Sequence, residues 1–328
     1  MAETLEIPAD FPKTAMDFEK RFSTEESCAE FLEKLRWPDG FVCPRCGSKA
    51  HWALRCRRLI ECVGCGHQSS VTAGTVFHGS RKPLKLWFRA MFLIVTQKLG
   101  VSAKNFQRHM GLRSYKTAWL WLHKLRRAMV RPERPKLEGS VEVDEAFVGG
   151  VEEGSHGRGS SNPIVAVAVE VIDDRQERER KKARLGRVRL EVIEDATEVS
   201  LTSFVAQNVR HGATIHTDGS TSYNELNEVG FKQQRHVIGK DRKRAVQLLP
   251  GVHRVISLVK RWLLGTHQGA VSAKHLYWYL QEYTFRFNRR LSSHPGKLVH
   301  RLAEQLMKTS PITYRTIVRG PEIRQEAA

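Results

Sequence analysis

Two short cysteine motifs, CPRCG and CVGCG, constrain this sequence more than any other feature. They place Cys43 and Cys46 in one pair and Cys62 and Cys65 in a second, with fifteen residues between the pairs. A CxxC turn lets two thiolates converge on one ion, and the glycine that follows each motif relieves the tight turn. Two such turns complete a tetrahedral site, which predicts a zinc ribbon at residues 39–80.

Four thiolates leave no open coordination position, so we expect zinc to fold this module and to do no chemistry. A redox role is the alternative for a CxxC pair, but the duplicated motif and the absence of a βαβ context argue against it. Cys28 and Cys56 fit neither pair, and we interpret both as packing residues. The N-terminal sequence lacks the basic and apolar regions of a signal peptide, which favours a reducing, cytoplasmic setting.

The net charge of the chain indicates which kind of molecule it binds. The 328 residues include 54 Lys and Arg against 35 Asp and Glu, which gives a net charge of +19 and favours a polyanion such as DNA. No run approaches the roughly 18 apolar residues of a membrane helix, so no membrane span is expected. With 41% apolar residues, the chain is also too hydrophobic to be a disordered basic tail.

Hydrophobic periodicity predicts helices on both sides of the ribbon. Apolar residues at helical spacing predict a helix that ends before Pro38, within an N-terminal helical segment at residues 1–38. After the ribbon come three helical patterns that are joined by short turns containing glycine. They predict a helix-turn-helix-like DNA-binding region at residues 81–131.

Residues 138–291 alternate between strand and helix patterns, as is typical of an α/β domain. The β runs SVEVDEAFVGG, NPIVAVAVEVI and GRVRLEVI predict an antiparallel meander. A helical segment, the short strand ATIHTD and a second helical pattern follow, which gives the order βββαβα. Two more helices come after Pro250, and residues 292–328 are left as a C-terminal tail of mixed pattern.

Two aspartates lie at strand positions that need an explanation. Alternation places Asp144 on the face of its strand opposite to Val141, Val143 and Glu145, and Asp218 ends ATIHTD, where ligands gather at a sheet edge. Taken singly, Asp144 is explained equally well as a salt-bridged acid, and Asp218 is explained equally well as a turn-forming aspartate. Together they would repel each other unless a divalent cation lay between them, and paired metal ions commonly serve phosphodiester displacement. The pattern therefore predicts a metal site at this edge.

The ribbon, SVEVDEAFVGG, IHTDGSTSY and the run from HRVISLVKRWLLGTHQG to FRFNRR together resemble bacterial insertion-sequence transposases with a zinc ribbon and a DDE-type catalytic domain. The resemblance extends from about Phe41 to Arg290. It implies an RNase H-like fold, a mixed sheet with flanking helices, and the βββαβα order agrees with this. It also implies cleavage at the ends of an insertion sequence and strand transfer into target DNA, by a nucleoid-associated homo-oligomer bound to double-stranded DNA.

By this resemblance Asp144 and Asp218 match the first two acids of a metal-binding triad, but the expected third glutamate is missing. The usual interval after Asp218 leads to His253, which would act as a neutral imidazole ligand. Because Mg²⁺ prefers oxygen ligands, a histidine shifts the expected catalytic ion from Mg²⁺ towards Mn²⁺. Glu282, which forms a helical set with Arg286, is the alternative third ligand.

Six basic residues are candidates for contacts with DNA, against the alternative of ordinary solvated charges. They are Lys260, Arg261, Lys243, Arg244, Arg113 and Lys116. A zinc-ribbon DNA-binding regulator without catalytic activity is the rival interpretation of the whole chain. It accounts for the charge, ribbon and helices, but it gives Asp144 and Asp218 no purpose. A decayed transposase and a metal-dependent nuclease on the same fold are further alternatives.

Overall fold

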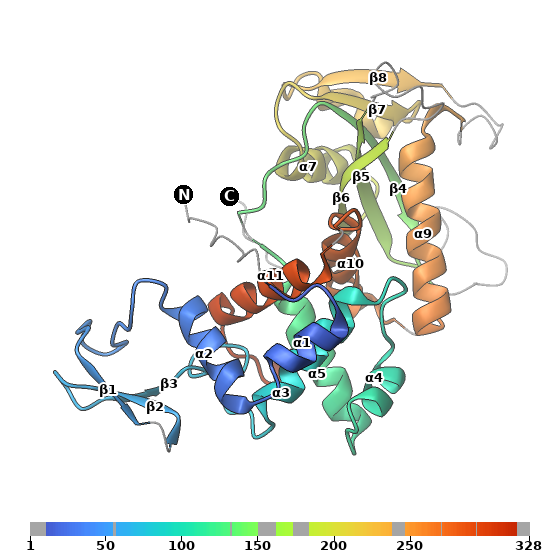
Figure 1. The fold of residues 1–328 in the computed structure, drawn as a ribbon. Coiled ribbons are helices and arrows are strands. Elements are labelled where there is room, and N and C mark those ends of the chain that lie inside the picture. Colours follow the sequence, from blue (N-terminus) through green and yellow to red (C-terminus); the bar gives the residue numbers. More distant parts are fainter. Residues whose placement is uncertain are drawn as a thin grey trace. The chain divides into compact units, whose positions relative to one another are not determined.

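The computed structural model describes residues 11–54, 57–131, 133–149, 162–172, 184–237, 247–269, 271–292 and 294–319. The chain forms two compact units, Met1–Arg131 with Leu291–Ala328 and Pro132–Arg290. Most of the helices and strands of both units are labelled in Figure 1. Among the described residues, no helix combines the length and the apolar composition needed to cross a membrane.

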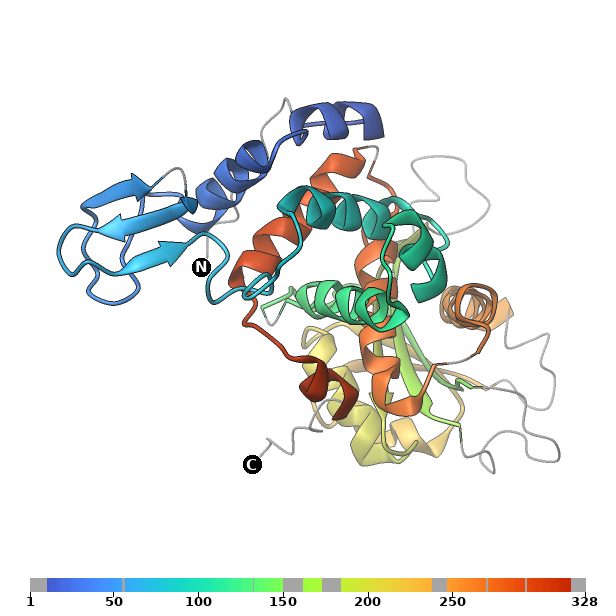
Figure 2. The same cartoon turned by 90° about the horizontal axis from the view of Figure 1, so that it is seen from below.

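The first unit contains helices and one small antiparallel sheet. Its helices are α1 (Ala15–Arg21), α2 (Glu25–Arg36), α3 (Leu84–Thr96), α4 (Ala103–His109), α5 (Tyr115–Ala128), α11 (Pro295–Lys308) and α12 (Tyr314–Arg319). Its strands are β1 (His51–Leu54), β2 (Leu59–Cys62) and β3 (Gln68–Ser70), in the order β1-β2-β3. Figure 2 shows these three strands, in blue, beside one another. The three helices predicted after the ribbon are confirmed as α3, α4 and α5.

The N-terminal helix predicted to end before Pro38 is wrong in one respect, because the chain forms two helices there. α2 begins with a capping box in which Thr24 accepts the Ser27 N–H at 3.1 Å and Ser27 accepts the Thr24 N–H at 3.4 Å. These side chains satisfy backbone donors that a continuous helix would have bonded internally. The cap therefore separates α2 from α1.

The segment interpreted as a C-terminal tail also forms regular structure. Its helix α11 packs against α2 and α3, and Val299, Leu302 and Leu306 are fully buried. These positions follow the three- and four-residue spacing of one helix face. Residues 291–319 therefore belong to the core of the first unit.

The second unit is a mixed five-stranded sheet with helices on both faces. The strands are β4 (Ser140–Phe147), β5 (Ile164–Ile172), β6 (Arg184–Ile193), β7 (Thr214–Asp218) and β8 (Lys232–His236), in the order β6-β5-β4-β7-β8. β4, β5 and β6 are antiparallel, whereas β7 and β8 run parallel to β4. This is the expected RNase H-like arrangement. The helical pattern predicted at residues 222–230 proves to be a short 3-10 helix, η3 (Thr221–Leu226), and β8 follows it as a strand that was not predicted.

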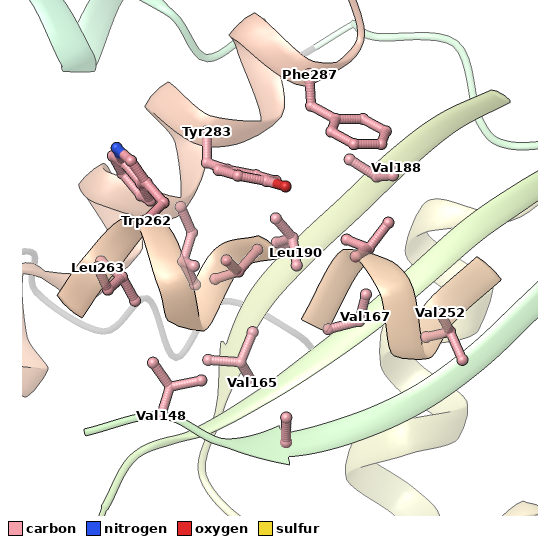
Figure 3. Packing of buried hydrophobic residues seen from close by; sticks show 14 of the residues in the cluster. Val148, Val165, Val167, Val188, Leu190, Val252, Trp262, Leu263, Tyr283 and Phe287 are labelled. Carbon is pink, nitrogen blue, oxygen red and sulfur yellow. The ribbon is translucent and has the colours of Figure 1, made fainter. Parts of the chain in front are cut away.

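Each face of this sheet has its own apolar core. On one face, α7 (Glu198–Asn208) and η3 cover Val141, Val143 and Ile215. On the other face, α9 (Pro250–His267) and α10 (Ala273–Phe287) pack against alternate residues of β4, β5 and β6. Figure 3 shows side chains of both helices directed at this face of the sheet, including Val252 and Tyr283. Because helices cover both faces and successive strand residues alternate between them, the residues from Val165 to Val169 of β5 are all apolar and buried.

A bulge between β5 and β6 creates a buried ion pair. Val169 lies opposite Val188 and Val171 lies opposite Leu185, so two residues of β6 face one residue of β5. In this bulge the Arg187 N–H donates to Glu170 Oε2 at 2.8 Å, and its guanidinium donates to Glu170 Oε1 at 2.6 Å. The carboxylate also accepts the Glu138 N–H at 3.0 Å, which fastens the segment that leads into β4. The pair thus ties three segments of the unit together.

Candidate functional site

The zinc-ribbon cysteines lie on two knuckles with the same backbone bonds. Gly47 donates to the Cys43 carbonyl and Gly66 donates to the Cys62 carbonyl, both at 2.9 Å. Both glycines have positive φ, +75° and +65°, a conformation that is costly for a residue with a Cβ. The predicted need for glycine after each CxxC motif is therefore confirmed.

The four cysteine sulfurs fit a tetrahedral zinc ion. All four lie within 4.8 Å of one another, with Sγ separations of 3.5 Å for Cys46 and Cys62 and 3.7 Å for Cys43 and Cys65. Zinc–sulfur bonds of about 2.3 Å place the sulfurs of a tetrahedron about 3.8 Å apart. The cluster therefore has the dimensions of a structural zinc site. Cys28 is buried in α2 and its thiol faces the Phe22 carbonyl, whereas Cys56 lies outside the described residues.

The sheet brings Asp144 and Asp218 together. β4 and β7 are parallel neighbours in which Glu142 lies opposite His216. The strand pairing ends at Glu142 and His216, two residues before Asp144 and Asp218, and the negative charge of Asp218 still acts on Asp144. Asp218 also accepts the Ser220 N–H at 3.0 Å, so it forms the predicted turn. The predicted alternation along β4 is confirmed, since Val141 and Val143 pack on the opposite face.

His253 approaches the same carboxylates from the first turns of α9. Its Nδ1 lies 3.5 Å from Asp144 Oδ2, and its side chain is about a quarter exposed. Burial lowers the pKa of His253, against the opposing effect of the negative charge of Asp218. A lowered pKa favours the neutral imidazole, which is the form that binds metal. Two carboxylates and one imidazole therefore converge from three separate elements.

The electrostatics of this cluster favour a bound cation. Burial, followed by the negative charges of Glu145 and Asp218, raises the pKa of Asp144 to about 7. The Glu145 N–H bond and the positive charge of Lys260 oppose this rise. A partly buried carboxylate beside two others is stabilised when a cation compensates its charge. The donor set of oxygen and imidazole ligands suits Mg²⁺ or Mn²⁺, so these residues fit the divalent ions implied by a DDE-type domain.

Sequence reasoning did not single out several polar residues around this cluster. Glu145 accepts the hydroxyl of the fully buried Tyr223 at 2.7 Å. On β7, His216 bonds Ser140 Oγ through Nε2 and His236 through Nδ1, each at 3.0 Å. The position of Glu145 next to Asp144 was the sequence feature that could have indicated its role. No sequence feature indicated His236, because β8 was not predicted.

The FRFNRR motif fastens α10 to the edge strand β6. Asn288 accepts the Val188 N–H at 2.8 Å and donates to the Val188 carbonyl at 3.2 Å, which imitates a neighbouring strand. Arg290 donates to the carbonyls of Gly186 and Leu185 on the same edge. These bonds occupy backbone groups that an exposed edge would leave open.

The alternative ligand Glu282 lies inside α10. It is fully buried and pairs with Arg286 one turn later, at 3.3 Å from Oε1 to Nε. The Arg286 guanidinium lies over the Trp262 ring at 5.1 Å. The spacing of Glu282 and Arg286 was also interpreted as a surface ion pair. The structure shows that the two residues do form an ion pair, and that this pair is buried.

The basic residues predicted to contact DNA lie in both units. Lys260 and Arg261 are exposed on α9. In the first unit, Arg113 is exposed in the turn before α5, and Lys116 Nζ lies 4.0 Å from the centre of the Tyr314 ring. Lys243 and Arg244 lie outside the described residues.

Comparison with known proteins gives a match in each unit. Residues 136–288 match the model of the ISXO2-like transposase domain, and residues 23–68 match that of the transposase zinc-ribbon domain. A protein of the transposable element ISH50 from Halobacterium salinarum is 28% identical over an alignment 301 residues long, and the match covers 85% of this chain and 95% of that protein.

Among solved structures, the catalytic core domain of BIV integrase is similar to part of this chain. The two are 17% identical, and the match covers 44% of this chain and 81% of the other with a TM-score of 0.29. The strand order β6-β5-β4-β7-β8 and the strand directions define the RNase H-like fold of the second unit.

Proposed function

We infer that this chain, which carries an ISXO2-like transposase domain and a transposase zinc ribbon, is a DNA transposase that cleaves and joins strands at the ends of a mobile element. The observation that carries the inference is the convergence of Asp144, Asp218 and His253 from β4, β7 and α9. A regulator that only binds DNA would gain nothing from two partly buried, neighbouring carboxylates, because their mutual repulsion costs stability unless a cation compensates it.

In this proposal Asp144, Asp218 and His253 would hold the divalent ions. When bound, such ions supply charge stabilisation for the attacking and leaving oxygens of an in-line displacement at phosphorus. Asp144 and Asp218 contribute oxygen ligands, and His253 contributes a neutral nitrogen. Tyr223 donates to Glu145, which holds the residue next to Asp144 in place.

The positive residues position DNA in the same proposal. Lys260 lies seven residues after His253 on α9, its positive charge acts on Asp144, and it is suited to a phosphate of the scissile strand. Arg261, Arg113 and Lys116 contact the backbone of the element ends and the target, and Lys243 and Arg244 are assigned the same role from sequence. Two ends must be joined in one event, so a homo-oligomer on double-stranded DNA is part of the proposal.

The test is a cleavage and strand-transfer assay in Mg²⁺ and Mn²⁺, with DNA binding measured in parallel. We expect wild type to cleave and join, and Asp144→Ala, Asp218→Ala and His253→Ala to bind DNA without either reaction. Asp39→Ala, at an exposed turn of the first unit, is the matched control and should react like wild type. Cleavage without joining would instead indicate a nuclease, and binding without cleavage in either metal would indicate a regulator or a decayed transposase.

A further inference from the structure

A buried glutamate on β4 holds the first turn of α9. Glu142 is 5% exposed, and its Oε2 accepts the Val252 N–H at 2.8 Å. The residue before α9, Leu249, provides no side-chain cap for the helix. Because the first turn of a helix has N–H groups without internal partners, Glu142 supplies an acceptor that the local sequence lacks.

Gly251 allows the carboxylate to come this close. A Cβ on Gly251 would lie 3.0 Å from Glu142 Oε2 and 3.1 Å from Leu185 Cδ2, both tighter than ordinary contact. Gly251 does not have positive φ, so its value lies in the space it leaves rather than in its backbone conformation. A glycine inside a helix costs about 1 kcal/mol relative to alanine, which the close approach of Glu142 offsets.

The clamped turn is the one that presents His253. Val252, which donates to Glu142, immediately precedes His253, whose Nδ1 lies 3.5 Å from Asp144 Oδ2. Glu142 and Asp144 occupy successive positions on the same face of β4, about 7 Å apart along the strand. β4 therefore contacts α9 at two consecutive points, one through a backbone amide and one through the imidazole.

We propose that Glu142, with the space left by Gly251, is a positioning residue that sets the distance between His253 and Asp144. The inference rests on the proposed function, since it assigns His253 to the metal site. Glu142 acts through its hydrogen-bond acceptor, and its charge is not used to bind metal. Displacing the first turn of α9 weakens the metal site without removing any of its ligands.

The experiment compares Glu142→Ala, Glu142→Gln and Gly251→Ala. Gly265→Ala is the matched control, because it lies on the same helix and a Cβ there would meet nothing within 4 Å. Mn²⁺ binding to the full-length protein without DNA is measured by electron paramagnetic resonance, and the half-saturating Mn²⁺ concentration is measured for strand cleavage. Thermal unfolding shows that each variant is folded.

We expect Glu142→Ala and Gly251→Ala to weaken Mn²⁺ binding and to raise the half-saturating concentration by about 10- to 100-fold, the usual effect of losing a residue that orients a ligand. Glu142→Gln keeps an oxygen acceptor and should stay close to wild type, as should Gly265→Ala. The proposal is overturned if Glu142→Gln is as damaging as Glu142→Ala, which would make the charge a ligand, or if Gly251→Ala binds Mn²⁺ normally. If wild type binds Mn²⁺ but never cleaves DNA, the proposed function fails, while the binding measurements still decide the role of Glu142.

Discussion

Replacing Glu170 by alanine should loosen the second unit, because its carboxylate holds β5, β6 and the segment before β4. It accepts the Glu138 N–H at 3.0 Å and the Arg187 N–H at 2.8 Å, and the Arg187 guanidinium donates to it from Nε at 2.9 and 3.1 Å and from a terminal nitrogen at 2.6 Å. Removing one partner of a buried pair costs about 3–5 kcal/mol. Arg187 is 32% exposed and keeps Glu138 at 3.6 Å, so we expect the low end, about 3 kcal/mol.

Amide hydrogen exchange with peptide resolution measures this loss in the second unit alone. A loss of about 3 kcal/mol corresponds to roughly 100-fold faster exchange in peptides of β5 and β6. Glu170→Gln keeps one acceptor and should cost about 1–2 kcal/mol. Glu228→Ala, at an exposed position of the same unit, is the control. If Glu170→Ala exchanges no faster than this control, the carboxylate does not stabilise the sheet and the reasoning is refuted.

The same carboxylate predicts an acid dependence with a definite sign. Burial alone would raise the pKa of Glu170, but the bonds from Arg187 and from the Glu138 N–H lower it below the ordinary value of 4.5. A group with a lowered pKa in the folded state stabilises fully above 4.5 and loses that contribution as pH falls through its folded pKa. Exchange rates divided by intrinsic rates should therefore show wild type and Glu170→Gln converging as pH falls from about 5 to about 3. A constant difference would contradict this.

Three further predictions concern the ribbon and the sheet edge. Cys62→Ser should lose the bound zinc, measured by plasma mass spectrometry, and ribbon peptides should exchange faster while those of the second unit are unchanged. Gly66→Ala, at φ +65°, should cost about 1–2 kcal/mol and speed zinc release to a chelator, whereas normal release would show that the knuckle tolerates a Cβ. Asn288→Ala removes both bonds to Val188 and should speed exchange of that amide by about tenfold or more, and unchanged exchange would mean that the edge is protected by other groups.

The arrangement of residues along β4 was predictable because strand alternation has a period of two. Once Val141 and Val143 were assigned to one apolar face, Asp144 had to lie on the other face, and the parallel pairing of β4 with β7 brings the ends of the two strands to the same edge. The zinc knuckles were predictable for a similar reason, since two thiolates with two residues between them leave few geometries. His253 came from the interval implied by the family resemblance, and periodicity alone would have read it as one position of a helix.

Other features were out of reach of the sequence because they depend on tertiary contacts. β8 reads KQQRH, which has no apolar alternation, and it becomes a strand because β7 offers its edge in parallel. FRFNRR was recognised as a signature of the resemblance, but its bonds to β6 join residues about 100 positions apart. Glu282 has the spacing of a surface ion pair and is buried, which only the packing of α10 reveals.

Distant carboxylates replace local caps in both units. α3 begins after Pro83 without a side-chain cap, and the Leu84 and Lys85 N–H groups donate to Glu25 at 2.8 and 2.9 Å. Glu25 lies in the first turn of α2, 59 and 60 residues earlier in the chain. A carboxylate at this position also faces the positive end of the helix dipole. The first turn of α3 is therefore complete only when α2 has packed beside it.

In α9 the carboxylate that replaces the cap belongs to Glu142, 110 residues earlier in the chain, and it also affects the candidate site. A capping side chain from the residue before α9 would complete the first turn in any position of the helix, because that residue moves together with the helix. With Glu142 as the acceptor, the Val252 N–H is satisfied only when α9 sits in one register against β4. Because that register also places His253 beside Asp144, an error in docking α9 leaves a buried backbone donor unpaired and is disfavoured by about 1–3 kcal/mol. The proposed role of Glu142 thus adds backbone hydrogen bonding to the direct contact between His253 and Asp144.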